Sequence, residues 1–284
     1  MADIIGFYSV AGSQGKRTIS STFAKLLVEN NHKVLYVELD ANRPSLTYST
    51  QITHALRNTL AFFKNVAETG KYQLDKFVLS KDDLLEDTED RGLAKLYKDL
   101  PDKLDYLVFP SDYKPTDFPT LISQDKEKEA QKIIQKLIFT LQESKYEYII
   151  VNLPTELESM FGYEMIANSK YVVNVITANA TRLHEYKEIR TFLDSNIKEL
   201  DQKWHNVMNM TTQEIGDSEY QNLIKGSHDT VIVPFDPDRQ ANELSLKIGS
   251  EQIQFHLESL AVAVHASIMR SDYEGGKRKK FFGR

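Results

Sequence analysis

A glycine-containing loop stands between an apolar run and a helical pattern near the start of the chain, and this order constrains the fold most strongly. The apolar run covers Ile4–Val10, and the helical pattern covers Thr18–Asn30. In a strand–loop–helix unit of this kind, backbone N–H groups and the helix N-terminus surround an anion, and a lysine adds a point charge. The segment therefore predicts a phosphate-binding loop at the start of an α/β domain.

The loop departs from the usual phosphate-loop pattern G-x-x-x-x-G-K-[ST] at two positions. Val10 replaces the first glycine, and Arg17 replaces the hydroxyl residue that binds Mg²⁺. Lys16 stays within reach of phosphates, and Thr18 falls in the first helical turn, where a hydroxyl can cap the helix or contact phosphate. An ordinary strand-to-helix turn is the alternative, but the position after the first strand favours phosphate binding. The expected loop residues are Gly12, Ser13, Gln14, Gly15, Lys16, Arg17 and Thr18.

Apolar, β-branched runs alternate with helical patterns along the rest of the chain. Near-continuous apolar runs are typical of strands that are buried on both faces of a parallel sheet. The alternation predicts an α/β fold, a doubly wound and mostly parallel sheet with helices on both faces. Residues 45–100 form an excursion after the second strand, residues 1–271 a single domain, and residues 272–284 a flexible tail. The expected strands are 4–10, 33–38, 105–109, 146–152, 171–177, 206–209 and 230–234, and the expected helices are 18–30, 52–63, 125–143, 156–168, 181–200 and 251–269.

Composition limits the function classes. The chain has 284 residues and a net charge of −6, which disfavours a protein that coats nucleic acid through its overall charge. It has no cysteine, which excludes disulfides, thiolate catalysis and cysteine-based metal sites. We therefore expect a cytoplasmic protein without a spanning segment, because no apolar run approaches the roughly 20 residues that cross a bilayer.

Five segments together resemble the MinD/ParA family of deviant-Walker P-loop ATPases. The loop is similar to the family's K-G-G-x-G-K-[ST], and residues 36–40, YVELD, resemble its D-x-D switch. Residues 146–154, YEYIIVNLP, resemble its Walker B strand, Y-D-Y-I-I-I-D-x-P. Residues 207–210, VMNM, and 233–237, VPFDP, are similar to its V-V-N-R and I-P-x-D-P segments. The order and spacing of these segments are more specific than any single one, and the loop departures point toward the atypical TadZ/CpaE or FlhG-like subgroups.

The resemblance implies an ATP or ADP site. It implies that Asn209 reads the adenine edge and that Pro234, Phe235 and Asp236 line the base. It gives the catalytic roles to Lys16 and Asp40, if the protein hydrolyses ATP. The residues at the positions that manage the metal are Glu38, Asp40 and Asn152.

The departures from the family pattern predict weakened Mg²⁺ chemistry. Arg17 replaces a neutral hydroxyl and Asn152 replaces a carboxylate, which together shift the local charge by about two positive units. This shift should weaken Mg²⁺ binding but not phosphate binding, because arginine is a good phosphate partner. We expect a nucleotide-responsive positioning or assembly factor with weak or no hydrolysis. An active ATPase with unusual metal ligands and a scaffold that binds no nucleotide stay open as alternatives.

The resemblance also implies partners. These are proteins of a secretion, pilus, flagellar or partition machine. A homodimer stays open, because the family's signature lysine, which reaches the partner's nucleotide, is replaced by Ala11.

The C-terminal tail combines basic and aromatic residues. Each cation near an anionic membrane surface contributes about 1 kcal/mol, and aromatic rings insert at the interface. The tail predicts a peripheral contact with the inner face of the plasma membrane. A solvated terminus and a nucleic-acid contact are the alternatives, the latter disfavoured by the net charge. The residues concerned are Lys277, Arg278, Lys279, Lys280, Phe281 and Phe282.

Overall fold

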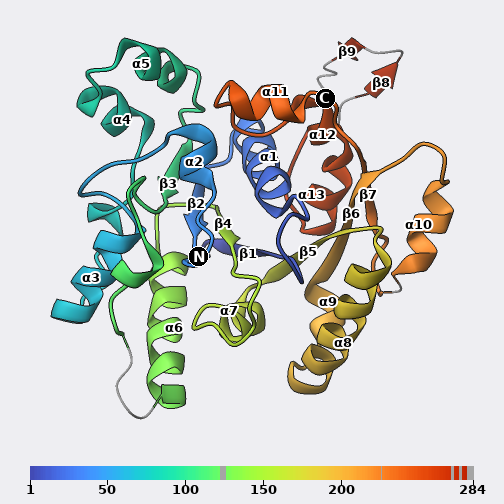
Figure 1. The fold of residues 1–284 in the computed structure, drawn as a ribbon, viewed down its shortest axis with the longest axis horizontal. Helices are drawn as coiled ribbons and strands as arrows, with labels where there is room; N and C mark the ends of the chain where they lie inside the picture. Colours follow the sequence, from blue (N-terminus) through green and yellow to red (C-terminus); the bar gives the residue numbers. More distant parts are fainter. Residues whose placement is uncertain (122–125, 225, 270–271, 275–276, 280–284) are drawn as a thin grey trace.

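The computed structural model describes residues 1–121, 126–224, 226–269, 272–274 and 277–279. Its centre is a seven-stranded sheet in the order β3-β2-β4-β1-β5-β6-β7 (Figure 1). All neighbouring strands in this sheet run parallel, which confirms the predicted doubly wound fold. The strands are β1 Asp3–Tyr8, β2 Val34–Glu38, β3 Leu104–Leu107, β4 Tyr148–Asn152, β5 Tyr171–Thr177, β6 Trp204–Thr211 and β7 Val231–Pro234.

Alternate side chains of each strand enter two separate hydrophobic cores. In β1, Ile5 and Phe7 belong to one core, and Ile4 and Tyr8 belong to the other. Successive side chains of a strand point to opposite faces of the sheet, so alternate residues enter different cores. Because both faces are buried, the central strands are apolar at nearly every position. Helices therefore cover both faces of the sheet, as the apolar runs predict.

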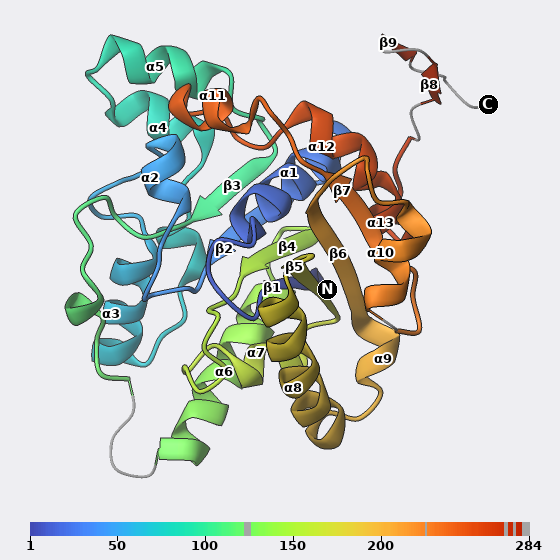
Figure 2. The ribbon, with the colours of Figure 1, turned by 45° about the vertical axis from the view of Figure 1, so that its right-hand side comes forward.

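The two sets of helices lie on opposite sides of the sheet (Figure 2). The first set packs with Phe7 and contains α1 Lys16–Glu29, α2 Leu46–Thr50, α4 Lys81–Asp87, α5 Arg91–Lys98, α12 Glu251–His256 and α13 Glu258–Ala263. The second set packs with Tyr8 and contains α3 Thr59–Thr69, α6 Lys126–Gln142, α7 Tyr163–Asn168, α8 Ala180–Asn196, α9 Leu200–Lys203 and α10 Asp217–Leu223. The remaining elements are α11 Arg239–Leu244, the 3-10 turns η1 Leu74–Lys76 and η2 Pro115–Asp117, and the short strands β8 Asp272–Glu274 and β9 Lys277–Lys279.

Two predicted helices are shorter than their apolar pattern suggested. The helix expected over 156–168 begins only at Tyr163, because Gly162 has a ψ of −93°, outside the helical region. The helix expected over 251–269 is divided at Leu257 into α12 and α13, and α13 ends at Ala263. There His265 takes a left-handed φ of 57°, and the N–H of Ala266 donates to the carbonyl of Ala261 at 2.8 Å. A left-handed residue followed by this 6→1 hydrogen bond is the helix C-terminus known as the Schellman motif, in which glycine usually occupies the left-handed position.

The excursion over residues 45–100 also differs from its prediction. The helical pattern over 52–63 becomes a helix only from Thr59, because the side chain of Asn58 accepts a hydrogen bond from the N–H of Ala61 and caps α3 there.

The helix predicted over 181–200 ends at Asn196, and the short helix α9 follows it as a separate element.

The C-terminal residues that the structure describes form a two-stranded antiparallel ladder, in which Tyr273 pairs with Arg278. Lys280, Phe281 and Phe282 of the predicted membrane contact lie outside the described residues. Among the helices that the structure describes, none has the length and apolar character to traverse a bilayer.

His205 of β6 is a buried imidazole, and it gives a prediction for the pH dependence of stability. Its side chain stacks on His228 with ring centroids 4.4 Å apart. Its Nε2 atom is buried without a hydrogen-bond partner. Burial, together with the nearby His228 and His265, lowers the pKa of His205 to about 4. The unfolded chain therefore binds a proton between pH 6.5 and pH 4 that the folded protein does not.

Lowering the pH from 7 to 5 should reduce the contribution of His205 to the unfolding free energy by about 2 kcal/mol. The difference between the wild type and His205→Gln isolates this contribution, because other titrating groups are common to both proteins. Urea unfolding at pH 7, 6 and 5 measures it. Parallel pH profiles for the two proteins would show that His205 is not held neutral.

Candidate functional site

The loop after β1 lies where the sheet topology opens a crevice. In the sheet, β1 and β4 are neighbours. The chain leaves β1 and passes β4 to reach β2, and it leaves β4 and passes β1 to reach β5, so the two connections run in opposite directions. Loops that leave neighbouring parallel strands in opposite directions form the usual ligand crevice of such sheets. The strand register places Asn152 opposite both Phe7 of β1 and Glu38 of β2. Two of the residues predicted at the metal position therefore meet beside the loop.

The loop itself is fixed from β5 and β6. Gly15 has a φ of 83°, a conformation that favours glycine, and a Cβ at this position would lie 2.1 Å from the Nδ2 atom of Asn209. That Nδ2 atom donates to the carbonyl of Gln14 at 2.8 Å. The Oε1 atom of Gln14 accepts from the N–H and the hydroxyl of Thr177, at 2.9 and 2.8 Å. Asn209, which the resemblance assigns to adenine, thus holds the loop backbone.

The N-terminus of α1 fits an anion. No side chain caps its first turn, and that turn carries no acidic residue. Orphan N–H groups and the helix dipole at such a terminus favour negative charge. The loop and helix therefore fit the phosphates of a nucleotide. The carbonyl of Thr18 accepts from the hydroxyl of Thr22 at 2.6 Å.

Lys16 and Asp40, the two predicted catalytic residues, lie together and are almost fully buried. The Lys16 ammonium donates to the carbonyl of Leu153 and lies 3.4 Å from Oδ2 of Asp40. Burial lowers the pKa of Lys16, while the Asp40 carboxylate opposes this shift. The other oxygen of Asp40 accepts from the N–H of Arg43 at 3.1 Å. Both oxygens of Asp40 are therefore engaged with the chain's own donors.

Glu38 and Asn152 meet, but the Glu38 carboxylate is engaged by the start of α2. Oε1 of Glu38 accepts from the N–H groups of Ser45 and Leu46 at 2.6 and 3.1 Å, at the start of α2. The Nδ2 atom of Asn152 lies 3.5 Å from the same oxygen. Oε2 of Glu38 and Oδ1 of Asn152 are buried without partners. Burial raises the pKa of Glu38, since ionisation is costly away from water.

The carboxylates at the positions that the resemblance assigns to the metal already have partners within the chain. Asp40 is paired with an ammonium, and Glu38 accepts backbone N–H groups. Over the described ranges of the chain, no three acidic or imidazole groups converge in a way that could hold a metal ion. The positions that the resemblance assigns to the metal therefore lie together, and both of their carboxylates accept from donors of the chain itself.

Arg17 points to α11. Its Nη2 atom lies 2.5 Å from Oε1 of Glu243, and its Nη1 atom donates to the carbonyl of Ser45 at 3.3 Å. Arg239 pairs with the same carboxylate at 3.4 Å. Arg17 and Arg239 therefore share the carboxylate of Glu243. Sequence reasoning missed Glu243 because 226 positions separate it from Arg17.

The segment predicted to line the base forms a turn between β7 and α11. Pro234 pairs with Thr211 of β6, and the Phe235 side chain is largely exposed. Asp236 accepts from the hydroxyl of Ser250 at 2.6 Å and so supports the turn. The structure thus brings Pro234 beside the end of the strand that carries Asn209, whereas Asp236 has a structural partner.

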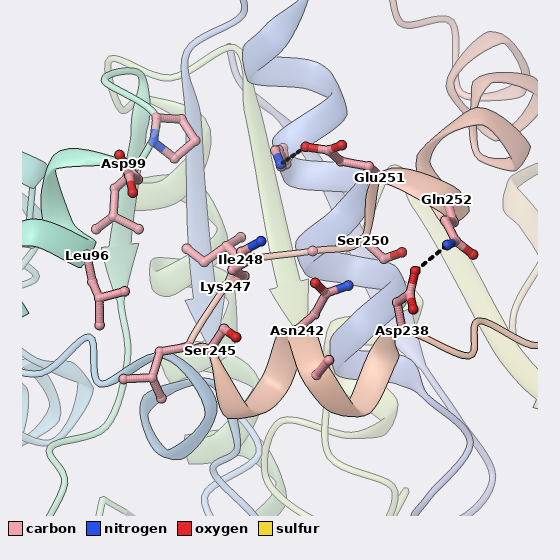
Figure 3. Close-up of a pocket in the computed structure, with 16 residues that line it drawn as sticks. Leu96, Asp99, Asp238, Asn242, Ser245, Lys247, Ile248, Ser250, Glu251 and Gln252 are labelled. Carbon is pink, nitrogen blue, oxygen red and sulfur yellow. Dashed lines mark hydrogen bonds and ion pairs between the residues drawn. The ribbon is translucent and has the colours of Figure 1, made fainter. Parts of the chain in front are cut away.

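A cavity of about 560 Å³ adjoins this region, between α5, α11, α12 and α1 (Figure 3). The side chain of Gln252 donates to Asp238 at 2.6 Å on one side, and Leu96 and Asp99 face the cavity from α5. A smaller hollow beside Arg17 and Thr18 shares its lining with this cavity, through Asn242, Lys247, Gly249 and Ser250. The concave surface therefore extends from the first turn of α1 to α5.

The model of the AAA domain family matches residues 2–210, about three-quarters of the chain. The chain belongs to the AAA domain family. No curated protein sequence matches it.

Several solved structures share the fold of this AAA domain protein. A protein described as a plasmid partition protein from Borrelia burgdorferi B31, bound to AMPPNP, is 15% identical with a TM-score of 0.65, over 93% of this chain and 98% of that chain. MinD from Pyrococcus horikoshii OT3 with Mg-ADP is 14% identical with a TM-score of 0.63, over 93% and 99%. MinD of the Aquifex aeolicus MinC:MinD complex is 18% identical with a TM-score of 0.62, over 96% and 100%. The predicted MinD/ParA-like P-loop fold is confirmed, whereas the subgroup stays a prediction.

Proposed function

We propose that this AAA domain protein is a nucleotide-responsive positioning or assembly factor that binds ATP or ADP and hydrolyses ATP slowly or not at all. One observation carries the proposal: the loop keeps Gly12, Gly15 and Lys16, while Glu38 and Arg17, at positions that manage Mg²⁺ in the family, are engaged by other parts of the chain. Glu38 accepts from the start of α2, and Arg17 pairs with Glu243.

Nucleotide binding is supported by the loop geometry. Gly15 takes its left-handed conformation over Asn209, and the first turn of α1 has no side-chain cap. The AMPPNP and Mg-ADP named for two structures of the same fold support a nucleotide in this place.

Slow hydrolysis is supported by the charges around Lys16. Phosphoryl transfer depends almost entirely on positioning and on charge stabilisation by metal and protein. Asp40 is held between the Lys16 ammonium and a backbone N–H, so it is not free to orient water. Asn152 offers a neutral amide where a carboxylate would order the metal's water ligands.

The class of partner is proposed from the descriptions of solved proteins that share this fold. Two of the neighbours are described as a partition protein and as MinD in complex with MinC. We propose a protein partner in a partition, pilus, flagellar or secretion machine, a cytoplasmic location, and a homodimer as the second assembly to test. The peripheral membrane contact of the tail stays a proposal.

Equilibrium binding of ADP and AMPPNP, with Mg²⁺ and with EDTA, tests the function. We expect binding in both conditions, with dissociation constants that differ by less than about threefold, equivalent to less than 1 kcal/mol. Lys16→Ala should weaken binding by about 100-fold, because it removes the buried cation next to the loop. Lys25→Ala is the control, since Lys25 lies on the same helix and faces Glu29 and Glu251 instead.

Turnover measurements separate the alternatives. Mg²⁺-dependent ATP hydrolysis at the rate of ordinary P-loop ATPases, lost in Lys16→Ala, would favour an active enzyme with unusual metal ligands. Absence of binding in the wild type, with Lys16→Ala indistinguishable from it, would favour a scaffold without nucleotide.

A further inference from the structure

A second cation lies over the phosphate loop, and the sequence motifs do not contain it. Arg43 belongs to the turn between β2 and α2. A Cβ placed on Gly12 would lie 2.9 Å from the Nη1 atom of Arg43. The guanidinium therefore occupies the space next to the loop that a side chain at position 12 would fill.

Arg43 makes two contacts, one through its backbone and one through its side chain. Its N–H donates to Oδ1 of Asp40 at 3.1 Å, and Asp40 in turn pairs with Lys16. Its Nη2 atom lies 3.4 Å from Oε1 of Glu156, in the loop after β4. The backbone of Arg43 is thus tied to the buried lysine pair, while its side chain is 58% exposed and free to change partners.

The contact with Glu156 is a weak one. An ion pair between partly exposed side chains at this distance contributes about 0–1 kcal/mol. Phosphate is a better partner for guanidinium, because it offers several charged oxygens that match the planar fork of donors. An anion in the loop therefore competes for the guanidinium with Glu156, whose other carboxylate oxygen, Oε2, is buried without a hydrogen-bond partner.

We infer that Arg43 is a phosphate-binding residue that exchanges Glu156 for the terminal phosphate of a nucleoside triphosphate in the loop. The inference rests on the proposed function. Lys16 and Arg43 then approach the phosphates from different strands of the same chain, β1 with its helix and β2 with its turn. One chain supplies both cations, although Ala11 carries none.

Discrimination between triphosphate and diphosphate follows from this arrangement. A triphosphate carries more charge and extends farther along the loop than a diphosphate, so it gains more from a cation beside Gly12. Charge neutralisation by Arg43 also requires no divalent ion.

The test compares the affinities of AMPPNP and ADP in EDTA by isothermal titration. Arg43→Ala should raise the dissociation constant of AMPPNP by about tenfold and that of ADP by less than about threefold. Arg43→Lys should fall between Arg43→Ala and the wild type, because it keeps the charge but not the fork. Arg57→Ala is the matched control. Arg57 lies in the excursion that follows Arg43 in the chain, and it pairs with Asp83 away from Gly12.

Glu156→Gln gives a second, opposite measurement. It should tighten AMPPNP binding by about threefold, because the competing carboxylate is removed, and this gain should vanish when Arg43→Ala is added. Circular dichroism melting of each variant separates loss of folding from loss of binding.

Unchanged or tighter AMPPNP binding in Arg43→Ala would overturn the inference while the proposed function stands. Equal losses for AMPPNP and ADP would also overturn the assignment to the terminal phosphate. Failure of the wild type to bind either nucleotide would overturn the proposed function and the inference together.

Discussion

Replacing Phe23 with alanine is expected to lower the free energy of unfolding by about 4 kcal/mol. Phe23 lies on α1 and is fully buried in the core on that face of the sheet. Its ring packs against that of Phe7 in β1, with centroids 5.7 Å apart. The substitution removes the transfer free energy of the ring and leaves a cavity between the helix and the strand that carry the phosphate loop.

Urea denaturation measures this loss, with the slope of the transition confirming that the unfolded state is unchanged. Phe139→Ala is the control, because Phe139 on α6 is 63% exposed and its removal should change stability by no more than about 0.5 kcal/mol. A loss below about 2 kcal/mol in Phe23→Ala would mean that α1 is not packed on β1 as described.

Gly162→Ala is the second substitution with a large expected effect, about 3 kcal/mol of destabilisation. A Cβ at Gly162 would lie 2.5 Å from the carbonyl oxygens of both Glu156 and Leu157. Both are backbone atoms, so relief of the overlap requires the loop between β4 and α7 to move. Because Glu156 belongs to that loop and contacts Arg43, nucleotide affinity should change together with stability.

Thermal unfolding and urea denaturation of Gly162→Ala are compared with those of Gly226→Ala. The nearest atoms to a Cβ on Gly226 are 3.6 Å away or more, an ordinary contact, so its stability should stay within about 1 kcal/mol of the wild type. Equal stability of the two variants would contradict the tight loop at Gly162.

The strands and the phosphate loop were predictable because local sequence determines them. Runs such as Ile149-Ile150-Val151 can be accommodated only where both faces of a strand are buried, and β4 has that burial. The helix ends were less predictable. Gly162 and His265 end or delay helices through backbone conformations that an apolar pattern does not encode.

The partners in the site could not be predicted, because they depend on how distant segments meet. Arg17 was expected to bring positive charge to the loop, but its guanidinium pairs with Glu243 on α11, which it shares with Arg239. Arg43 carries no motif at all, and only the turn after β2 brings it to Gly12. The identity of a charged side chain is visible in a sequence, whereas its counter-ion is a property of the fold.

The hydrogen bonds from Ser45 and Leu46 to Glu38 set a limit on redesign. A hydroxyl residue at position 17 and a carboxylate at position 152 would match the residue types of the family pattern. Glu38 would still accept hydrogen bonds from the N–H groups at the start of α2. A carboxylate at 152 would also face Glu38 in a buried place, where two negative charges repel strongly. An exchange of these two side chains would therefore leave the path of the chain between β2 and α2 unchanged, because Glu38 sets that path.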